Sequence, residues 1–281
     1  MEISSLPMDD LKLLGLQRAE FEVAEKSQSM SDRLQFTIFI VSILVIALEQ
    51  EWVSYAGGVL NVLLALSWQF YAYKGRRSHY IAERARRAVL LSGGLGVNVT
   101  GKLYSDILMQ FTVSEPEGRK YEDPNYFKAY GPQGYKRLAA MLQESAFWTK
   151  HLFDKSAGYY WWAFGIGLII AVVGLLLMPS VTEGSACFMV AQIFCVLLVW
   201  LVTGGVFTRA LNYTTAARAV DDVENRLNNA VSGQSLENDL VVILGDYNAI
   251  VQDAPTIPTS IYQRNREQLN RLWSESRESN G

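Results

Sequence analysis

The chain has 281 residues, of which 50% are hydrophobic and 19% are charged, and its formal net charge is −3 at neutral pH. These averages resemble those of a soluble protein, but the apolar residues are concentrated in four blocks that contain no formal charge. Such blocks do not suit a soluble enzyme of this size, and they make the lipid bilayer the expected solvent for about a third of the chain.

Residues 1–33 are polar and predict a cytoplasmic helix that begins near Pro7. Asp9 and Asp10 would lie in its first turn, where acidic side chains interact favourably with the helix dipole. The segment lacks the apolar stretch of a cleavable signal peptide, so we expect membrane insertion to start from the first apolar block.

The apolar blocks form two pairs, 34–48 with 52–73 and 159–178 with 186–207, and a very short acidic turn joins each pair. A spanning helix needs roughly 20 apolar residues to cross about 30 Å of hydrocarbon, and three of the blocks meet this length. The first block is short, about 22 Å as a helix. It could be a buried core helix, but its tight pairing with a full-length span favours a membrane segment, provided that Arg33 extends to the interface.

The cations around the blocks predict the topology. Neither turn, 49–51 or 179–185, contains Lys or Arg, whereas the opposite ends of all four blocks have basic flanks. Because cytoplasmic flanks are enriched in Lys and Arg, both turns are expected outside and both termini in the cytoplasm. The predicted fold class is therefore an all-α membrane protein with two transmembrane hairpins, residues 34–73 and 157–207. The flanking cations are Lys26, Arg33, Lys74, Arg76, Arg77, Lys150, Lys155, Arg209 and Arg218.

Residues 74–156 and 208–281 are expected to form further cytoplasmic helices that extend from the hairpins. The last block should continue as a helix over 209–230, and the second block over 80–91. Glycine and proline predict an irregular segment at 93–134, which could be a separate folded unit or a loop, with a helix resuming over 133–152.

The C-terminal part of this region is divided by prolines. Residues 236–251 are expected to be helical or mixed, until two prolines in 253–258 interrupt them. A final helix over 259–275 has an apolar face, formed in part by Tyr262, that must pack against another element.

No arrangement of residues in the sequence indicates catalysis. The histidines are not spaced as metal ligands. Cys187 and Cys195 lie in the fourth block, where we expect them to pack as small apolar residues. We therefore expect a protein that is not an enzyme and needs no metal or cofactor. A membrane enzyme that uses Glu144 or the acidic group at 221–224 is a weaker alternative.

Neutral polar residues within the blocks are candidates for lining a pore. Asn61 and Gln192 lie deepest, and Ser42 and Thr203 accompany them. Such groups can simply form hydrogen bonds between helices, worth about 0.6 kcal/mol each. Because no charge lies within a block, a conducting path would have to be built by assembly of several subunits.

Several local strings resemble the SMODS-associated four-transmembrane effectors, a family assigned a pore-forming role beside bacterial cyclic-oligonucleotide synthases in CBASS-type antiphage systems. The strings are 17–21, the Arg- and Ala-rich stretch after the second block, 142–149 and 254–258. The resemblance implies a homo-oligomer in the bacterial inner membrane, a cyclic oligonucleotide ligand, a functional link to its synthase and abortive infection; DNA is not an expected partner. The residues that carry it include Glu144, Ser145, Phe147, Pro255, Pro258 and Tyr262.

A cyclic oligonucleotide needs cations for its phosphates and aromatic rings for its bases. Arg84, Arg86, Arg87 and Lys102, together with the aromatic side chains of 93–135, could supply them. The same arginines could instead face anionic lipid headgroups. The expected function is a membrane effector that breaches the bilayer on a nucleotide signal; the alternative is a membrane scaffold or a constitutive small ion channel.

Overall fold

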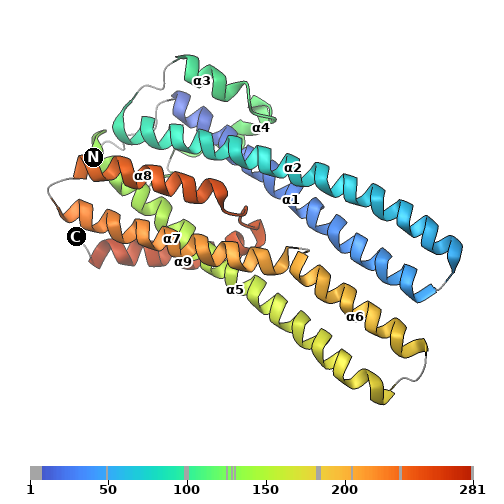
Figure 1. Cartoon of the computed structure of the whole chain (residues 1–281). Helices are drawn as coiled ribbons and strands as arrows, with labels where there is room; N and C mark the ends of the chain where they lie inside the picture. The colour runs from blue at the N-terminus through green and yellow to red at the C-terminus, as the bar shows by residue number, and fades with distance from the viewer. Residues whose placement is uncertain are drawn as a thin grey trace. The chain divides into compact units, whose positions relative to one another are not determined.

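The computed structural model describes residues 8–48, 50–97, 101–124, 126–127, 129, 131–181, 185–203, 205–233 and 236–279. Every regular element within these ranges is a helix, as Figure 1 shows. The helices are α1 (Met8–Leu48), α2 (Glu51–Leu95), α3 (Gly101–Leu108), α4 (Glu115–Arg119), α5 (Tyr135–Val181), α6 (Ser185–Thr203), α7 (Val206–Ser232), α8 (Leu236–Asp253) and α9 (Thr259–Ser279).

Among the described residues, four stretches of helix are long and apolar enough to cross a membrane. They belong to α1, α2, α5 and the α6 region, so the four predicted spans are confirmed as membrane-length helices. Helices α1, α2 and α5 contain 41, 45 and 47 residues. At 1.5 Å per residue each exceeds about 60 Å, twice the thickness of the hydrocarbon core. In a bilayer, each of these helices would therefore extend well beyond the lipid.

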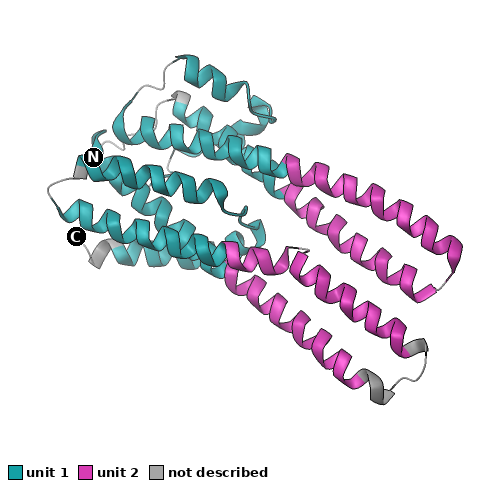
Figure 2. Cartoon of the chain, in the orientation of Figure 1, with its two compact units in different colours: residues 1–25, 75–155, 213–281 teal, residues 26–74, 156–212 magenta. Residues whose placement is uncertain are grey.

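The chain divides into two compact units (Figure 2). Unit 1 contains residues 1–25, 75–155 and 213–281, and unit 2 contains residues 26–74 and 156–212. Helices α1, α2, α5 and α7 each contribute residues to both units. The connection between the units is therefore made by continuous helices rather than by loops.

Unit 1 has a buried apolar interior. Leu13, Leu14, Val89 and Ile107 form one fully buried cluster from α1, α2 and α3. A second cluster is centred on Phe147, Leu152 and Leu269, where the apolar face of α9 packs against α5. The docking face predicted for the last helix is thus found against α5.

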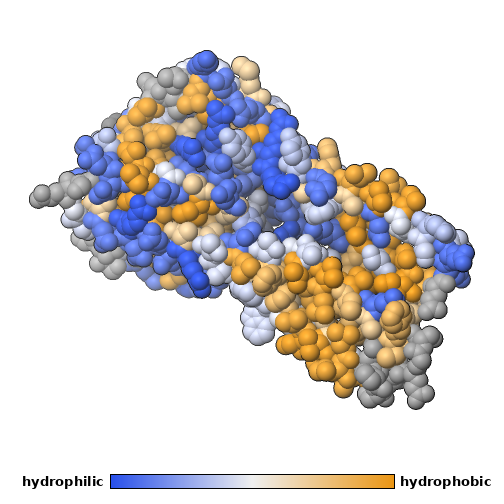
Figure 3. Space-filling model, viewed as in Figure 1, coloured by the Kyte–Doolittle hydropathy of each residue, from blue (hydrophilic) through white to orange (hydrophobic). Residues whose placement is uncertain are grey.

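Unit 2 has the opposite distribution of apolar side chains. Leu66, Leu176 and Phe188 are 64%, 74% and 69% exposed, and apolar side chains gather over this part of the chain in Figure 3. A soluble monomer rarely exposes a contiguous apolar surface of this kind, whereas a bilayer accommodates it. Only a few positions, such as Ala171 and Leu201, are fully covered by neighbouring helices.

Small and aromatic residues make the helix contacts within unit 2. A Cβ atom added at Gly167 would lie 2.7 Å from Leu201 on α6, so glycine allows α5 and α6 to approach closely. The rings of Phe39 on α1 and Trp200 on α6 stack at 5.1 Å between centroids. Helix α1 therefore contacts α6 as well as its neighbour α2.

Two predictions about element boundaries were wrong. The segment 93–134 is not irregular throughout, because α2 extends to Leu95 and α3 and α4 follow within it. The carboxylate of Glu117 accepts a hydrogen bond of 3.1 Å from the backbone N–H of Ser114, which stabilises the start of α4. The helix expected to end at 152 continues as α5 to Val181, because nothing in the sequence stops it. Pro7, expected at the first helix start, lies outside the described residues.

The last apolar block was expected to continue as a helix over 209–230, and α7 covers these residues, but the helix is interrupted before α7 begins. Helix α6 ends at Thr203 and α7 begins at Val206. Between them Gly205 has a φ of +90°, a conformation that glycine tolerates and other residues disfavour. The backbone N–H of Arg209 then donates a 2.8 Å hydrogen bond to the Gly205 carbonyl. Residues 236–251 were expected to be helical or mixed, and the structure shows one helix, α8, over 236–253.

Candidate functional site

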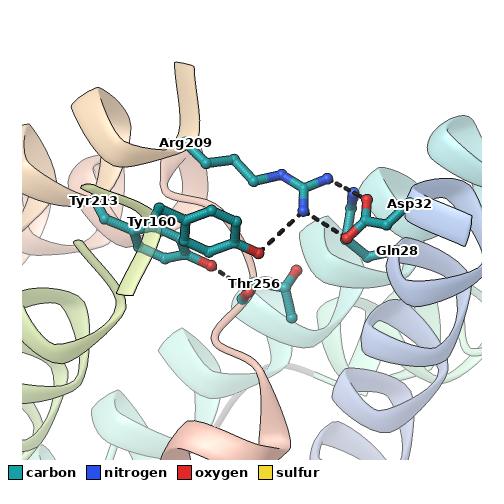
Figure 4. Close-up of polar contacts among 6 residues, drawn as sticks. All are labelled: Gln28, Asp32, Tyr160, Arg209, Tyr213 and Thr256. Carbon is teal, nitrogen blue, oxygen red and sulfur yellow. Dashed lines mark hydrogen bonds and ion pairs between the residues drawn. The ribbon is translucent and has the colours of Figure 1, made fainter. Parts of the chain in front are cut away.

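A polar cluster in unit 2 joins α1, α5 and α7 (Figure 4). The guanidinium of Arg209 on α7 donates to both carboxylate oxygens of Asp32 on α1. Its Nη1 also donates to the hydroxyl of Tyr160 on α5, at 3.1 Å. The Arg209 and Asp32 side chains are only 18% and 35% exposed. We call Gln28, Asp32, Tyr160 and Arg209 the Arg209 cluster.

Each member of the Arg209 cluster is positioned by another. The amide of Gln28, one turn before Asp32 on α1, donates a 2.9 Å hydrogen bond to the Asp32 carboxylate. The guanidinium carbon of Arg209 lies 5.6 Å from the centre of the Tyr160 ring, within the range of a cation–π contact. A carboxylate that receives two guanidinium N–H groups forms one of the stronger side-chain pairs in proteins.

The Arg209 cluster lies at the start of α7. Arg209 lies in the first turn of α7, directly after the break at Gly205. The ion pair therefore fixes the start of α7 to α1, the helix that pairs with α2. Removing one member of a buried ion pair costs about 3–5 kcal/mol, and partial exposure reduces this figure here. The cluster is therefore a discrete polar link between α1, α5 and α7.

The four pore-lining candidates differ in their surroundings. The Asn61 amide on α2 donates to the Ser42 hydroxyl on α1 at 3.3 Å, which is the interhelical hydrogen bond considered from the sequence. The Asn61 Oδ1 atom is buried without a hydrogen-bond partner among the described residues. Thr203 donates to the Val199 carbonyl of its own helix at 2.7 Å, and both Thr203 and Gln192 are exposed on α6. The structure thus pairs two of the four candidates.

The phosphate-binding candidates in unit 1 contact protein groups. Arg84 donates to the Gln110 side chain at 3.1 Å, and Arg87 lies 3.5 Å from the Gln252 side chain. Lys102 is exposed near the start of α3. The three arginines therefore do not form a single free cationic face.

Arg86 is the most enclosed of the phosphate-binding candidates. Its Nη2 atom lies 2.9 Å from Glu83, and its guanidinium covers the Tyr247 ring at 5.1 Å. Burial lowers the pKa of Arg86, but the Glu83 carboxylate and the Tyr247 ring outweigh it and hold that pKa above its ordinary value. Arg86 thus already has Glu83 as a counter-ion, while its Nε and Nη2 atoms have no hydrogen-bond partner among the described residues.

The residues that carry the family resemblance lie in the interior and in the loop between α8 and α9. Phe147 belongs to the buried α5–α9 cluster, and the Tyr262 ring lies 6.1 Å from that of Trp148. Glu144 is buried and Ser145 is half-buried on α5. Pro255 and Pro258 are half-buried in the loop. These positions indicate a structural contribution to unit 1.

Two residues with extensive polar contacts, Asp32 and Arg18, were not singled out as site residues from the sequence. Asp32 was overlooked because the predicted topology depends only on the cations beside the apolar blocks. A carboxylate before the first block and an arginine after the last one are nevertheless visible in the sequence. Arg18 was missed as well. It donates to the Tyr121 carbonyl at 2.9 Å and covers the Tyr126 ring at 5.4 Å. No sequence pattern connects these distant positions.

The described residues define a class: an all-helical protein with four helices long and apolar enough to cross a membrane. No family model, no curated protein and no solved structure matches the chain. In the described part of the chain, no group of three or more His, Cys, Asp or Glu side chains is arranged to hold a metal ion.

Proposed function

We propose that the protein is a membrane effector that opens a path through the bacterial inner membrane when its cytoplasmic part senses a cyclic oligonucleotide. In this proposal α1 with α2, and α5 with α6, cross the bilayer as two hairpins with their turns outside. Unit 1 and both termini lie in the cytoplasm. The basic flanks of the apolar blocks and the buried apolar interior of unit 1 support this orientation.

The observation that carries the proposal is the Arg209 cluster. An ion pair that joins α1, just before the first hairpin, to α7, just after the second, is a contact that can be present in a closed state and absent in an open one. When it opens, α7 can turn at Gly205, and the neutral apolar spans of several subunits can reassemble around a path. The lipid bilayer and further copies of the same chain are the expected partners, and a cyclic-nucleotide synthase is the expected source of the signal.

The energetics set a requirement on the ligand. To shift a two-state equilibrium from 1:99 to 99:1, a ligand must favour the open state by about 5.5 kcal/mol. A charged ligand with several phosphates can reach this value if it forms several new ion pairs in one state only. Binding that is equal in both states would leave the membrane intact.

The test is dye release from liposomes that contain the purified protein. A panel of cyclic di- and trinucleotides is added, with their linear counterparts as controls. The proposal expects release with at least one cyclic ligand and none with its linear counterpart. Absence of release under every ligand would contradict it.

A second candidate is a constitutive channel or a membrane scaffold. The contacts of Arg84, Arg86 and Arg87 favour it, because their nearby partners compete with a phosphate ligand. A channel would give the same conductance across planar bilayers with and without nucleotides. A scaffold would give no conductance under either condition. In both cases, expression should leave cell growth unchanged.

A further inference from the structure

We infer that the loop 254–258, between α8 and α9, couples unit 1 to the helices that carry the apolar segments. The loop and its two ends contact α1, α2, α5 and α7, and all these contacts lie within unit 1. These are the four helices that also contribute residues to unit 2. A segment that contacts every connecting helix is placed to move them together.

The contacts with α7 and α2 are made at Thr256. The Tyr213 hydroxyl on α7 donates a 2.7 Å hydrogen bond to the Thr256 carbonyl, as Figure 4 shows. The Thr256 hydroxyl lies 3.4 Å from Nδ1 of His79 on α2. The other ring nitrogen of His79 lies 3.1 Å from the Val251 carbonyl in the last turn of α8.

The contacts with α1 and α5 follow immediately. Glu25 on α1 accepts a 2.6 Å hydrogen bond from the backbone N–H of Thr259 and a further one from its hydroxyl. The Glu25 carboxylate thus receives one of the N–H groups that the start of α9 leaves without a helical partner. Ile257 packs against the buried cluster that contains Phe147 and Leu152 of α5.

The sequence of the loop keeps it stiff. Pro255 and Pro258 have fixed φ angles and restrict the residue before each of them to extended conformations. The Pro258 carbonyl accepts hydrogen bonds from Ile261 and Tyr262 at 3.0 and 3.1 Å, which joins the loop firmly to α9. A displacement of α8 or α9 is therefore transmitted through the loop and is not absorbed by it.

The contacts lie near the positions where the helices pass from one unit to the other. Glu25 is the last residue of α1 in unit 1, and Tyr213 is the first residue of α7 in unit 1. His79 lies one turn after Gly75, where α2 enters unit 1. A contact at these positions can change the direction of the whole helix, because a helix bends little over one turn.

Hydrogen exchange of the full-length protein in nanodiscs tests the inference without reference to any ligand. Tyr213→Phe removes one hydrogen bond to the loop, and Glu25→Ala removes the tie to α1. Loss of one partly buried hydrogen bond is expected to speed exchange about five-fold, and Glu25→Ala, which removes two, should have at least this effect. We expect this change in the loop and also in residues 26–33 for Glu25→Ala and in 206–212 for Tyr213→Phe, with α3 unchanged. Tyr80→Phe, at an exposed position, is the matched control.

If exchange became faster only in residues 254–262, the loop would have a local structural role alone, and the inference would be overturned. If Glu25→Ala speeds exchange throughout unit 1, that variant has destabilised the whole unit. The milder Tyr213→Phe variant then tests the inference by itself. A second assay uses the Pro255→Ala/Pro258→Ala variant, which should bind an activating cyclic nucleotide as the parent does but release at least five-fold less dye. This assay rests on the proposed function, whereas the exchange experiment keeps its meaning if no nucleotide acts on the protein.

Discussion

At the scale of single residues, the ion pair of Asp32 with Arg209 is the most informative. Asp32→Asn leaves the guanidinium partly buried with a weaker partner. We expect a loss of about 1–3 kcal/mol in the free energy of unfolding, measured by denaturant titration in detergent micelles. Asp154→Asn, at an exposed position in unit 1, is the control. Equal stability of the two variants would show that the ion pair contributes nothing.

Asn61 separates a structural from a conducting role. Asn61→Leu removes one hydrogen bond to Ser42, worth about 0.6 kcal/mol. It also removes a buried oxygen without a hydrogen bond among the described residues, which costs about 1–3 kcal/mol. We therefore expect thermal unfolding in detergent at an unchanged or higher temperature. Clear destabilisation would mean that Oδ1 has a partner in the assembled protein, such as a second subunit.

These residues also show which parts of the polar contacts could be predicted from the sequence. It indicated Ser42 and Asn61 as polar groups within apolar blocks, and their spacing within each block was readable. Their mutual hydrogen bond depends on how α1 and α2 rotate against each other, which apolar periodicity does not determine. Asp32 and Arg209 are 177 positions apart in the chain, so only packing brings them together.

At the scale of elements, the break between α6 and α7 makes a sharp prediction. Gly205 has a φ of +90°, so Gly205→Ala introduces a side chain into a disfavoured conformation that costs about 1–2 kcal/mol. Gly158→Ala on α5 is the control, because a Cβ atom there meets nothing within 4 Å. We expect Gly205→Ala to lower the unfolding temperature in detergent and Gly158→Ala to leave it unchanged or raise it. The reverse order would contradict the break.

The spans and the C-terminal helices were predictable because long apolar runs and paired prolines are strong local signals. The break at Gly205 was not, because Gly205 lies within an apolar block where small residues also allow helices to pack closely. Helices α3 and α4 were hidden for a related reason. Glycine and proline around them suggest loops, and α3 is held by the buried side chain of Ile107, which belongs to one cluster with residues of α1 and α2.

At the scale of the whole molecule, the two units contrast in what surrounds them. Unit 1 buries most of its apolar side chains, with exceptions such as Met109 and Val241, whereas unit 2 exposes most of its own. This contrast predicts that Cys195 of α6, which is exposed in the isolated chain, lies in lipid. In intact membranes, a Cys187→Ala variant should resist a charged maleimide and react only after denaturation. Rapid labelling in intact membranes would place α6 in water.

The central claim is that a cytoplasmic nucleotide signal opens a membrane path that the Arg209 cluster holds closed. Dye release from liposomes containing either the wild-type protein or Asp32→Asn tests it most directly. The account predicts that wild-type liposomes stay tight until a cyclic oligonucleotide is added, whereas Asp32→Asn liposomes release dye without ligand. Liposomes that stay tight with both proteins under every ligand would contradict it.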